Sequence, residues 1–172
     1  MRVGIGYDSH RFEEGRPLVL GGVRIPDAPG LAGHSDGDAV SHAITDALLG
    51  ATGLGTIGAL FPDDDPAYRD ADSVRLLAEA VRRLEAENYQ VVNVDVTVIA
   101  ERPRIGLHAA AMAERIAEVV HTAPPAVSIK GKTNEAMGWI GRGEGLAVIA
   151  VASVDQIRDI DALLASLRSS GG

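Results

Sequence analysis

The chain has 172 residues, no cysteine and a formal net charge of −8. Its length fits one domain, and a hydrophobic content of 46% is enough to bury a core, which excludes disorder as the main state. Without cysteine the chain has no disulfide framework and no thiolate metal site, so a bound metal must use histidine or carboxylate ligands. No apolar run approaches the roughly 20 residues that cross a bilayer, and we expect a soluble cytoplasmic protein without membrane partners.

The negative charge is concentrated near the start of the chain. Residues 1–72 hold twelve acidic and five basic side chains, a net charge of −7, whereas residues 73–172 carry only −1. Nucleic-acid binding needs clustered basic residues that neutralise phosphates, so we expect no nucleic-acid partner. A bound metal cation would offset the acidic charge locally.

The first half of the chain predicts a strand, a hairpin and a helix. Alternating residues predict a strand over 3–10, and two apolar runs around Gly-Gly predict a hairpin over 18–25. Turn-forming residues predict a loop over 26–37. Apolar residues at helical spacing then predict a helix of about 14 residues that begins at Asp38. The Gly-, Pro- and Asp-rich stretch 54–71 predicts a long loop, which is often a functional element.

The second half alternates helices and strands. Helical spacing predicts a helix from Asp72 or Ser73 to about residue 88 and another over about 107–121. Strands are predicted over 126–130 and 146–154, separated by a polar, Gly-rich segment.

The clearest strand pattern lies at 92–98. It predicts one buried face, formed by Val92, Val94, Val96 and Val98. The opposite face carries Asn93, Asp95 and Thr97, which need water or a partner subunit against them.

The order of these elements favours an α+β fold over a doubly wound one. We expect a two-layer sandwich in which a mixed β-sheet carries helices on one face. Residues 1–154 would form this single domain, and residues 155–172 would form an amphipathic tail helix.

Three residues suggest a metal site. Asp8 and His10 lie two apart on a strand, so their side chains leave the same face, although this pair alone also fits a polar strand end. His42 interrupts an apolar helix, and we expect Asp38 or Asp46, one turn away on either side, to accept the second N–H of its imidazole. Two imidazoles and one carboxylate would form a zinc site with one open position, as in catalytic sites.

The only two lysines suggest a second functional segment. Lys130 and Lys132 share one face at a strand end and could bind a phosphate together with Thr133 and Asn134, although a solvated strand end explains them equally well. Glu135 could serve a harder cation such as Mg²⁺, which prefers oxygen ligands.

Taken together, several motifs identify a known family. In chain order they are Gly-Tyr-Asp-x-His at 6–10, His-Ser-Asp-Gly-Asp at 34–38 followed by His42, Phe-Pro-Asp-x-Asp-Pro at 61–66, Asn-Val-Asp at 93–95, Lys-Thr-Asn-Glu at 132–135, and Gly-Arg-Gly-Glu-Gly at 141–145. Over residues 1 to about 154 the chain resembles the 2-C-methyl-D-erythritol 2,4-cyclodiphosphate synthase family.

The resemblance implies a homotrimeric enzyme of non-mevalonate isoprenoid biosynthesis. Such enzymes are phosphorus-oxygen lyases that convert 4-diphosphocytidyl-2-C-methyl-D-erythritol 2-phosphate into the cyclic diphosphate and CMP. Their active sites lie between subunits. A central cavity on the threefold axis, which Arg142 would face here, can hold an isoprenoid diphosphate.

The resemblance also implies residue roles. Asp8, His10 and His42 would bind Zn²⁺ or another divalent cation, and Glu135 would bind a Mg²⁺ or Mn²⁺ ion that bridges the substrate diphosphate. His34 and Thr133 would stabilise the transition state. The implied substrate contacts are Asp8, His10, His34, Ser35, Thr56, Ile57, Gly58, Phe61, Asp63, Ala100, Pro103, Arg104, Lys132, Thr133, Asn134, Glu135, Trp139 and Arg142. Among them, residues 100–106 and the stretch from Lys132 would hold the cytidine, and Asp63 the erythritol hydroxyls.

The chain departs from the family pattern at a few positions. Thr56 stands where Asp usually contacts the ribose from the adjacent subunit. Asp64, Arg104 and Trp139 replace the common Thr, Lys and Phe, and the tail after Val154 is longer than usual.

Two other functions fit the same residues. One is a zinc-dependent phosphohydrolase, in which water takes the open metal position. The other is a non-catalytic, metal-stabilised trimer that binds an isoprenoid diphosphate.

Overall fold

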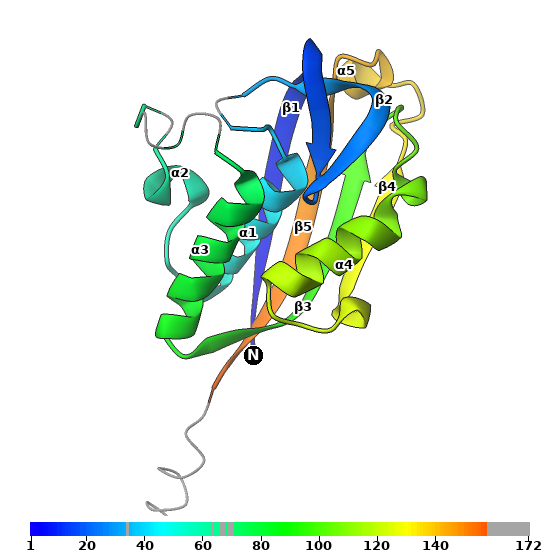
Figure 1. The fold of residues 1–172 in the computed structure, drawn as a ribbon. Coiled ribbons are helices and arrows are strands. Elements are labelled where there is room, and N and C mark those ends of the chain that lie inside the picture. Colours follow the sequence, from blue (N-terminus) through cyan, green and yellow to red (C-terminus); the bar gives the residue numbers. More distant parts are fainter. Residues whose placement is uncertain (34, 63, 66–67, 69–70, 158–172) are drawn as a thin grey trace, which may run out of the picture.

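A five-stranded mixed sheet forms one layer of the protein (Figure 1). The computed structural model describes residues 1–33, 35–62, 64–65, 68 and 71–157. The strand order is β2-β1-β5-β3-β4, with bounds β1 Arg2–Leu20, β2 Val23–Leu31, β3 Tyr89–Ile99, β4 Val127–Lys132 and β5 Gly145–Gln156. Only β3 and β4 pair in parallel, and the other neighbours pair antiparallel. The predicted mixed sheet is confirmed.

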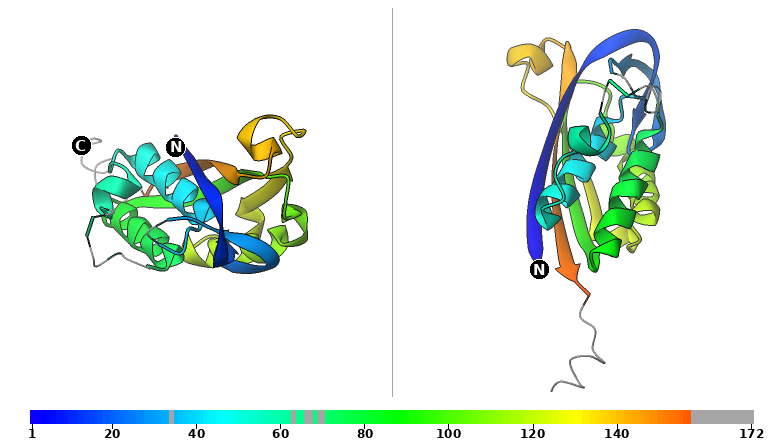
Figure 2. Two further views of the ribbon diagram at one scale, coloured as in Figure 1. Left: turned by 90° about the horizontal axis from the view of Figure 1, so that it is seen from above. Right: turned by 90° about the vertical axis from the view of Figure 1, so that its left-hand side faces the viewer.

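Helices form the second layer, on one face of the sheet. Figure 2 shows the sheet edge-on in its right-hand view, with the three long helices on the same side. They are α1 Ala39–Thr52, α3 Ser73–Ala86 and α4 Ala109–Val119; the short ones are α2 Ile57–Leu60, α5 Gly138–Gly141 and the 3₁₀ turns Ile105–Leu107 and Pro124–Ala126. The two-layer prediction is confirmed. The predicted helix starts at Asp38 and at Asp72 or Ser73 are also confirmed, with Asp38 and Asp72 as the N-caps of α1 and α3.

The hairpin is longer than its sequence pattern predicts. Gly21 and Gly22 form the turn with φ of 57° and 71°, as expected for a tight hairpin. The predicted loop over 26–37 is wrong in its first part, because β2 continues to Leu31, which pairs with Phe12. Since β2 is an edge strand, it tolerates the prolines that suggested a loop.

The first half of β1 lies directly under α1. A methyl group at Gly4 would lie 2.0 Å from the carbonyl oxygen of Ala47, and one at Gly6 would lie 1.9 Å from that of Ala43. The two glycines therefore allow the helix backbone to approach the strand at close range, and this contact sets the position of His42 above the strand.

The alternation of β3 is confirmed in its central part. Val94, Val96 and Val98 are fully buried. Val92, however, is 41% exposed, because a register shift between Val91 and Asn93 reverses the alternation there, and its predicted burial is wrong.

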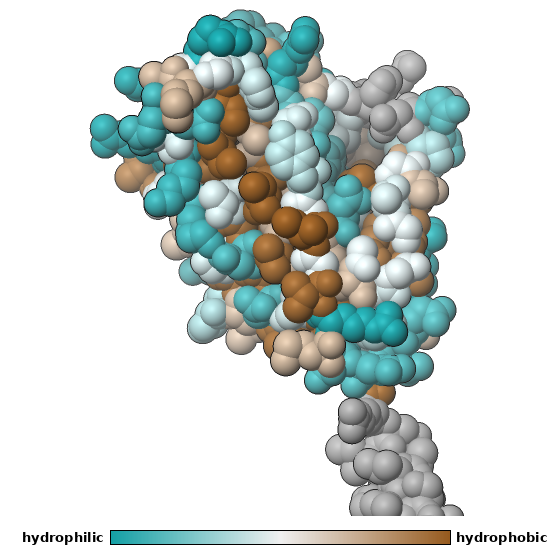
Figure 3. All heavy atoms as spheres, turned by 180° about the vertical axis from the view of Figure 1, so that it is seen from behind, coloured by the Kyte–Doolittle hydropathy of each residue, from teal (hydrophilic) through white to brown (hydrophobic). Residues whose placement is uncertain are grey.

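The sheet face opposite the helices is partly apolar (Figure 3). On β1 the large side chains point to this face, and Val3, Ile5 and Tyr7 are 63%, 69% and 58% exposed. Val151 of β5 pairs with Ile5 and continues the strip. On β3 the predicted polar row lies beside it, where Ser153 donates to Asn93 and Lys130 pairs with Asp95.

The C-terminal strand extends slightly beyond its predicted end. Asp155 and Gln156 belong to β5 and not to a tail helix, and the remainder of the predicted tail, residues 158–172, lies outside the described residues. Among the described residues, no helix has the length and apolar character needed to cross a membrane.

Candidate active site

A buried carboxylate fixes the start of α1. Asp38 caps the helix by accepting from the backbone N–H groups of Val40 and Ser41, both at 3.1 Å. It also accepts from the hairpin amides of Gly21 at 2.8 Å and Gly22 at 2.7 Å. Complete burial raises the pKa of Asp38, whereas these hydrogen bonds act in the opposite direction. One side chain thus attaches the hairpin to the helix that carries His42.

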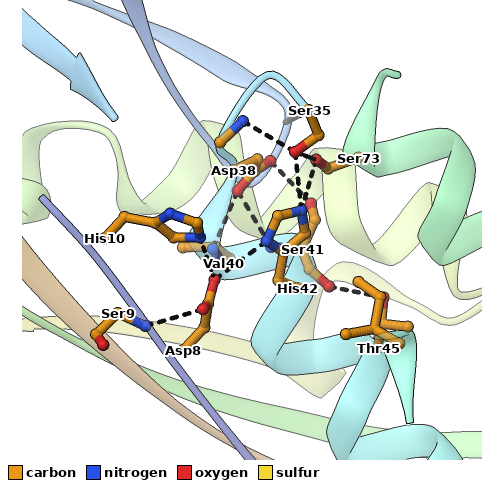
Figure 4. Close-up of polar contacts among 12 residues, drawn as sticks. Asp8, Ser9, His10, Ser35, Asp38, Val40, Ser41, His42, Thr45 and Ser73 are labelled. Carbon is orange, nitrogen blue, oxygen red and sulfur yellow. Dashed lines mark hydrogen bonds and ion pairs between the residues drawn. The ribbon is translucent and has the colours of Figure 1, made fainter. Parts of the chain in front are cut away.

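Asp8, His10 and His42 converge near the start of this helix (Figure 4). The Asp8 Oδ2 atom lies 2.9 Å from His10 Nε2 and 3.1 Å from His42 Nδ1. One ligand atom from each residue lies within 4.8 Å of the others. The structure therefore brings together the three side chains that the sequence analysis selected.

The environment of His10 fits a bound cation. Its Nδ1 atom lies 2.7 Å from the carbonyl oxygen of Ala32, which can only accept, so Nδ1 carries the hydrogen and Nε2 the lone pair of the neutral ring. Nε2 is buried and has no hydrogen-bond partner in suitable geometry among the described residues, although Asp8 lies close to it. A lone pair directed at a carboxylate oxygen is unfavourable without a cation between them, so the site could hold a metal ion.

The charges of the site are coupled. Burial alone would raise the pKa of Asp8, but the imidazoles of His10 and His42 hold it well below its ordinary value. The Asp8 carboxylate in turn raises the pKa of His10, against the opposing effect of burial. Asp8 is therefore an anion at neutral pH.

The residues behind His42 differ from the prediction. Its Nε2 atom lies 2.9 Å from Ser73 Oγ and 3.2 Å from Ser35 Oγ. The expected support from Asp38 or Asp46 is wrong: Asp38 turns back to cap the helix, and Asp46 accepts from the N–H of Ile57 at 2.7 Å. No sequence signal connects Ser73 to His42, because it begins a different helix 31 residues away.

A pocket of about 270 Å³ opens beside the three residues. Of the other predicted substrate contacts, it brings together Ser35, Ile57, Gly58 and Phe61. Tyr68, which the sequence pattern did not indicate, also lines the pocket, and its ring lies edge-on to Phe61 at 5.3 Å between centroids. Thr56 is exposed and caps α2 through a hydrogen bond from the N–H of Ala59. His34 and Asp63 lie outside the described residues.

The rim of this pocket is held by Arg16, which sequence reasoning also missed. Its guanidinium donates to the carbonyl oxygen of Gly33 at 2.7 Å and to that of Ser35. Arg16 thus fixes the backbone on both sides of position 34.

A second group of predicted residues follows the end of β4. The Glu101 carboxylate accepts from the backbone N–H groups of Asn134 at 2.9 Å and Ala136 at 3.1 Å, and Thr133 donates to Glu135 at 2.6 Å. Glu101 therefore supports the turn that carries Glu135, whose φ is 52°. Another anchor of this segment is the hydrogen bond from the N–H of Ala100 to the carbonyl oxygen of Lys132.

The two lysines of the expected phosphate-binding pair differ in their contacts. Lys130 forms an ion pair with Asp95 on the outer sheet face, so only Lys132, which is exposed, remains for a phosphate. Of the other predicted contacts, Pro103 is half-buried and Arg104 exposed just after β3, whereas Trp139 lies near His10 and Arg11 in a separate shallow pocket. Arg142 is exposed and pairs with Glu144 at 2.6 Å.

The two groups remain apart within one chain. They lie at the same end of the sheet, but β5 and β3 separate β1 from β4. At about 4.8 Å per strand, this separation is about 14 Å. The described metal-ligand cluster accordingly contains Asp8, His10 and His42 but not Glu135.

Comparisons with known proteins identify the family of the chain. The model of the YgbB family matches residues 1–155. A curated 2-C-methyl-D-erythritol 2,4-cyclodiphosphate synthase from Gemmatimonas aurantiaca is 59% identical over 154 residues, which cover 90% of this chain and 93% of the relative.

Solved structures share the fold. A 2C-methyl-D-erythritol-2,4-cyclodiphosphate synthase in a CDP-bound form matches with a TM-score of 0.82 and 40% identity over 90% of this chain and 100% of that chain. A CDP complex of IspF from Plasmodium falciparum matches with a TM-score of 0.79 and 34% identity over 91% and 97% of the two chains. The chain therefore belongs to the YgbB family, the family of 2-C-methyl-D-erythritol 2,4-cyclodiphosphate synthases.

Proposed function

We propose that this protein converts 4-diphosphocytidyl-2-C-methyl-D-erythritol 2-phosphate into 2-C-methyl-D-erythritol 2,4-cyclodiphosphate and CMP, as a phosphorus-oxygen lyase of the non-mevalonate isoprenoid pathway. The observation that carries the proposal is the convergence of Asp8, His10 and His42 beside a pocket in a member of this family. The CDP bound in solved relatives supports a cytidine diphosphate substrate.

The reaction needs no nucleophile from the protein. An oxygen of the substrate's 2-phosphate attacks the β-phosphorus, and the bond from that phosphorus to the bridging oxygen breaks, so CMP leaves with the electron pair. The second pKa of a phosphate monoester is about 6, so the attacking group is largely ionised at neutral pH without a general base. The protein must align the two phosphates and neutralise the charge that develops on their oxygens.

The residues present fit this task. Asp8, His10 and His42 would hold Zn²⁺ or another divalent cation, and Glu135 would hold Mg²⁺ or Mn²⁺; bound cations of this kind withdraw charge from phosphoryl oxygens. Asp8 is already ionised at neutral pH, because its pKa is held low, and is therefore ready to act as a ligand. Ser35 presents a hydroxyl group in the same pocket that can donate to a phosphate oxygen.

A homotrimer would complete the site. Asp8, His10 and His42 lie on one side of the sheet end and Glu135 on the other, separated by two strands. A head-to-tail ring of copies can bring the first group of one subunit to the second group of its neighbour. The exposed apolar strip of Val3, Ile5, Tyr7 and Val151 supports a subunit interface on the outer sheet face.

Several expectations remain predictions within this proposal. They are the single domain over residues 1–154, the cytoplasmic location, the transition-state roles of His34 and Thr133, the contact of Asp63 with the erythritol hydroxyls, and the position of Arg142 at a central cavity that holds an isoprenoid diphosphate. The contact between Thr56 and the ribose is also still a prediction. In the single chain the Thr56 hydroxyl group caps α2.

Product analysis by phosphorus NMR tests the function. We expect a cyclic diphosphate and CMP in equal amounts with no inorganic phosphate. Release of inorganic phosphate would instead identify a phosphohydrolase. The His42→Ala variant tests the role of the metal. Loss of an outer-shell partner can cost roughly 100-fold in activity, and loss of His42 itself should reduce turnover by more than that. Full turnover in a folded His42→Ala protein would show that the metal has no part in the mechanism.

A further inference from the structure

A chain of hydrogen-bonding groups lies behind His42, on the side away from Asp8. Ser73 is fully buried at the start of α3, and its Oγ atom lies 2.9 Å from His42 Nε2 and 2.5 Å from Asp36 Oδ1. Figure 4 shows Ser35 and Ser73 together on one side of the imidazole and Asp8 on the other. None of the roles derived above uses Asp36 or Ser73.

Asp36 determines the direction of this chain. Its Oδ1 atom also accepts from the backbone N–H of Asp38 at 3.1 Å, and its Oδ2 atom accepts from the N–H of Ser73 at 3.4 Å. A carboxylate oxygen accepts hydrogen bonds, so the single hydroxyl hydrogen of Ser73 goes to Asp36 at 2.5 Å in preference to the more distant Ser35 Oγ at 3.2 Å. The oxygen of Ser73 then has only lone pairs left to offer to His42.

That assignment favours a hydrogen on Nε2 of the imidazole. An unprotonated Nε2 atom would place its lone pair against the lone pairs of Ser73 Oγ at 2.9 Å, which is unfavourable in a buried site. With the hydrogen on Nε2, the N–H points between Ser73 Oγ at 2.9 Å and Ser35 Oγ at 3.2 Å. The lone pair of the neutral ring is then on Nδ1, which faces Asp8 Oδ2 at 3.1 Å. In the metal-free protein this contact with Asp8 favours the opposite tautomer, and a cation between the two atoms removes the conflict, as at His10.

We propose that Asp36 and Ser73 are positioning residues that hold His42 in its Nε2–H tautomer, so that Nδ1 is available as a metal ligand. The inference rests on the metal centre of the proposed function. At His10 the carbonyl oxygen of Ala32 has the same effect directly, because it accepts from Nδ1 and so leaves the lone pair of the neutral ring on Nε2. Supports of this kind behind a ligating imidazole typically change metal affinity 10- to 100-fold.

The test uses the full-length protein and two measurements. Nitrogen-15 NMR of the metal-free protein, at a pH where the imidazole is neutral, reports which nitrogen of His42 carries the hydrogen. Competition with a chromophoric chelator reports the affinity for Zn²⁺. For Ser73→Ala and Asp36→Asn we expect a smaller Nε2–H population and a 10- to 100-fold weaker affinity.

Two further variants separate positioning from folding. Ser73→Thr keeps the hydroxyl group and should restore most of the affinity. Asp72→Asn removes a neighbouring charge but keeps a good helix cap, so it should leave both measurements unchanged. A thermal melt of each variant confirms that the protein is folded.

The outcomes are distinguishable. Wild-type tautomer and affinity in both Ser73→Ala and Asp36→Asn would overturn the positioning role and leave the metal centre intact. A wild-type protein that binds no divalent cation would overturn the metal centre, and this inference with it. Failure of Ser73→Thr to restore affinity, together with weakened Asp72→Asn, would show that any change at the start of α3 disturbs the site, which would also overturn the inference.

Discussion

Gly6 of β1 lies directly beneath the carbonyl oxygen of Ala43, the residue that follows His42 in α1. A methyl group at position 6 would lie 1.9 Å from that oxygen, a distance that no side-chain adjustment can relieve because the obstacle is backbone. The distance between His42 and Asp8 therefore depends on the absence of a side chain at Gly6, although Gly6 is not itself a predicted metal ligand.

Gly6→Ala should lower both stability and metal affinity. Displacing α1 from the strand should cost about 3 kcal/mol of unfolding free energy, the upper part of the usual range for overpacking. Urea denaturation measures the stability, and chelator competition measures the affinity.

Gly50→Ala, in the helix that packs on Gly6, is the matched control. A methyl group there meets no atom within 4 Å, so the substitution should raise the unfolding free energy by about 0.5–1 kcal/mol by improving helix propensity. Equal effects of the two substitutions would contradict the close-packing argument.

Asp38→Ala should be strongly destabilising. It removes the cap of α1, which is worth about 1 kcal/mol, and leaves the amides of Gly21 and Gly22 without their acceptor, at about 1–3 kcal/mol each. We expect a total loss of roughly 3–7 kcal/mol in urea denaturation. Asp72→Ala, which removes a cap with a single side-chain hydrogen bond to Val74, should cost only about 1 kcal/mol; similar losses for both would show that the hairpin contact contributes nothing.

Metal affinity should fall as the pH falls. Asp8 raises the pKa of His10 in the metal-free protein above its ordinary value. Below this raised pKa, His10 carries a hydrogen that must leave before Nε2 can bind a cation, so the affinity should drop about tenfold per pH unit. The decline should begin above about pH 6.5, the pKa of an unperturbed histidine.

Zn²⁺ titrations at several pH values measure the affinity. Repeating them in buffers of different ionisation enthalpy measures how many protons are released when the metal binds. His121→Gln is the control, because His121 pairs with Glu85 at the far end of α3 and should leave the profile unchanged. An affinity that is independent of pH would contradict the coupling of Asp8 to His10.

Two inactive variants should restore activity when mixed. If each site combines His42 of one subunit with Glu135 of its neighbour, a trimer assembled from His42→Ala and Glu135→Gln chains contains some intact sites. For random mixing in a head-to-tail ring, about one site in four is intact. The two proteins are unfolded together, refolded and assayed, and activity near a quarter of wild type is expected; no recovery beyond the refolded single variants would argue for sites within one chain.

Much of the fold could be predicted from local patterns. The caps at Asp38 and Asp72, the Gly-Gly turn and the buried valines at 94, 96 and 98 all follow from interactions within a few residues of the chain. The bulge that exposes Val92 could not be predicted, because it depends on the pairing of β3 with β5, about 60 residues later.

The site shows the same contrast between local sequence signals and long-range contacts. Asp8, His10 and His42 could be selected because Asp-x-His spacing on a strand and an isolated histidine in an apolar helix are local signals. Ser73 and Arg16 could not, since each acts through contacts with distant segments that leave no periodic trace. The prediction for Asp38 and Asp46 was wrong because it considered only helix neighbours, whereas both carboxylates turn to other backbone amides.

The exposed apolar side chains of β1 should affect the yield of folding. If the proposed trimer forms, a newly folded chain presents Val3, Ile5 and Tyr7 to water until it associates. Such a particle adheres readily to chaperones, surfaces and other immature chains. The yield of the proposed trimer on refolding should therefore depend on subunit concentration, because dilute chains are lost to non-productive contacts before they associate.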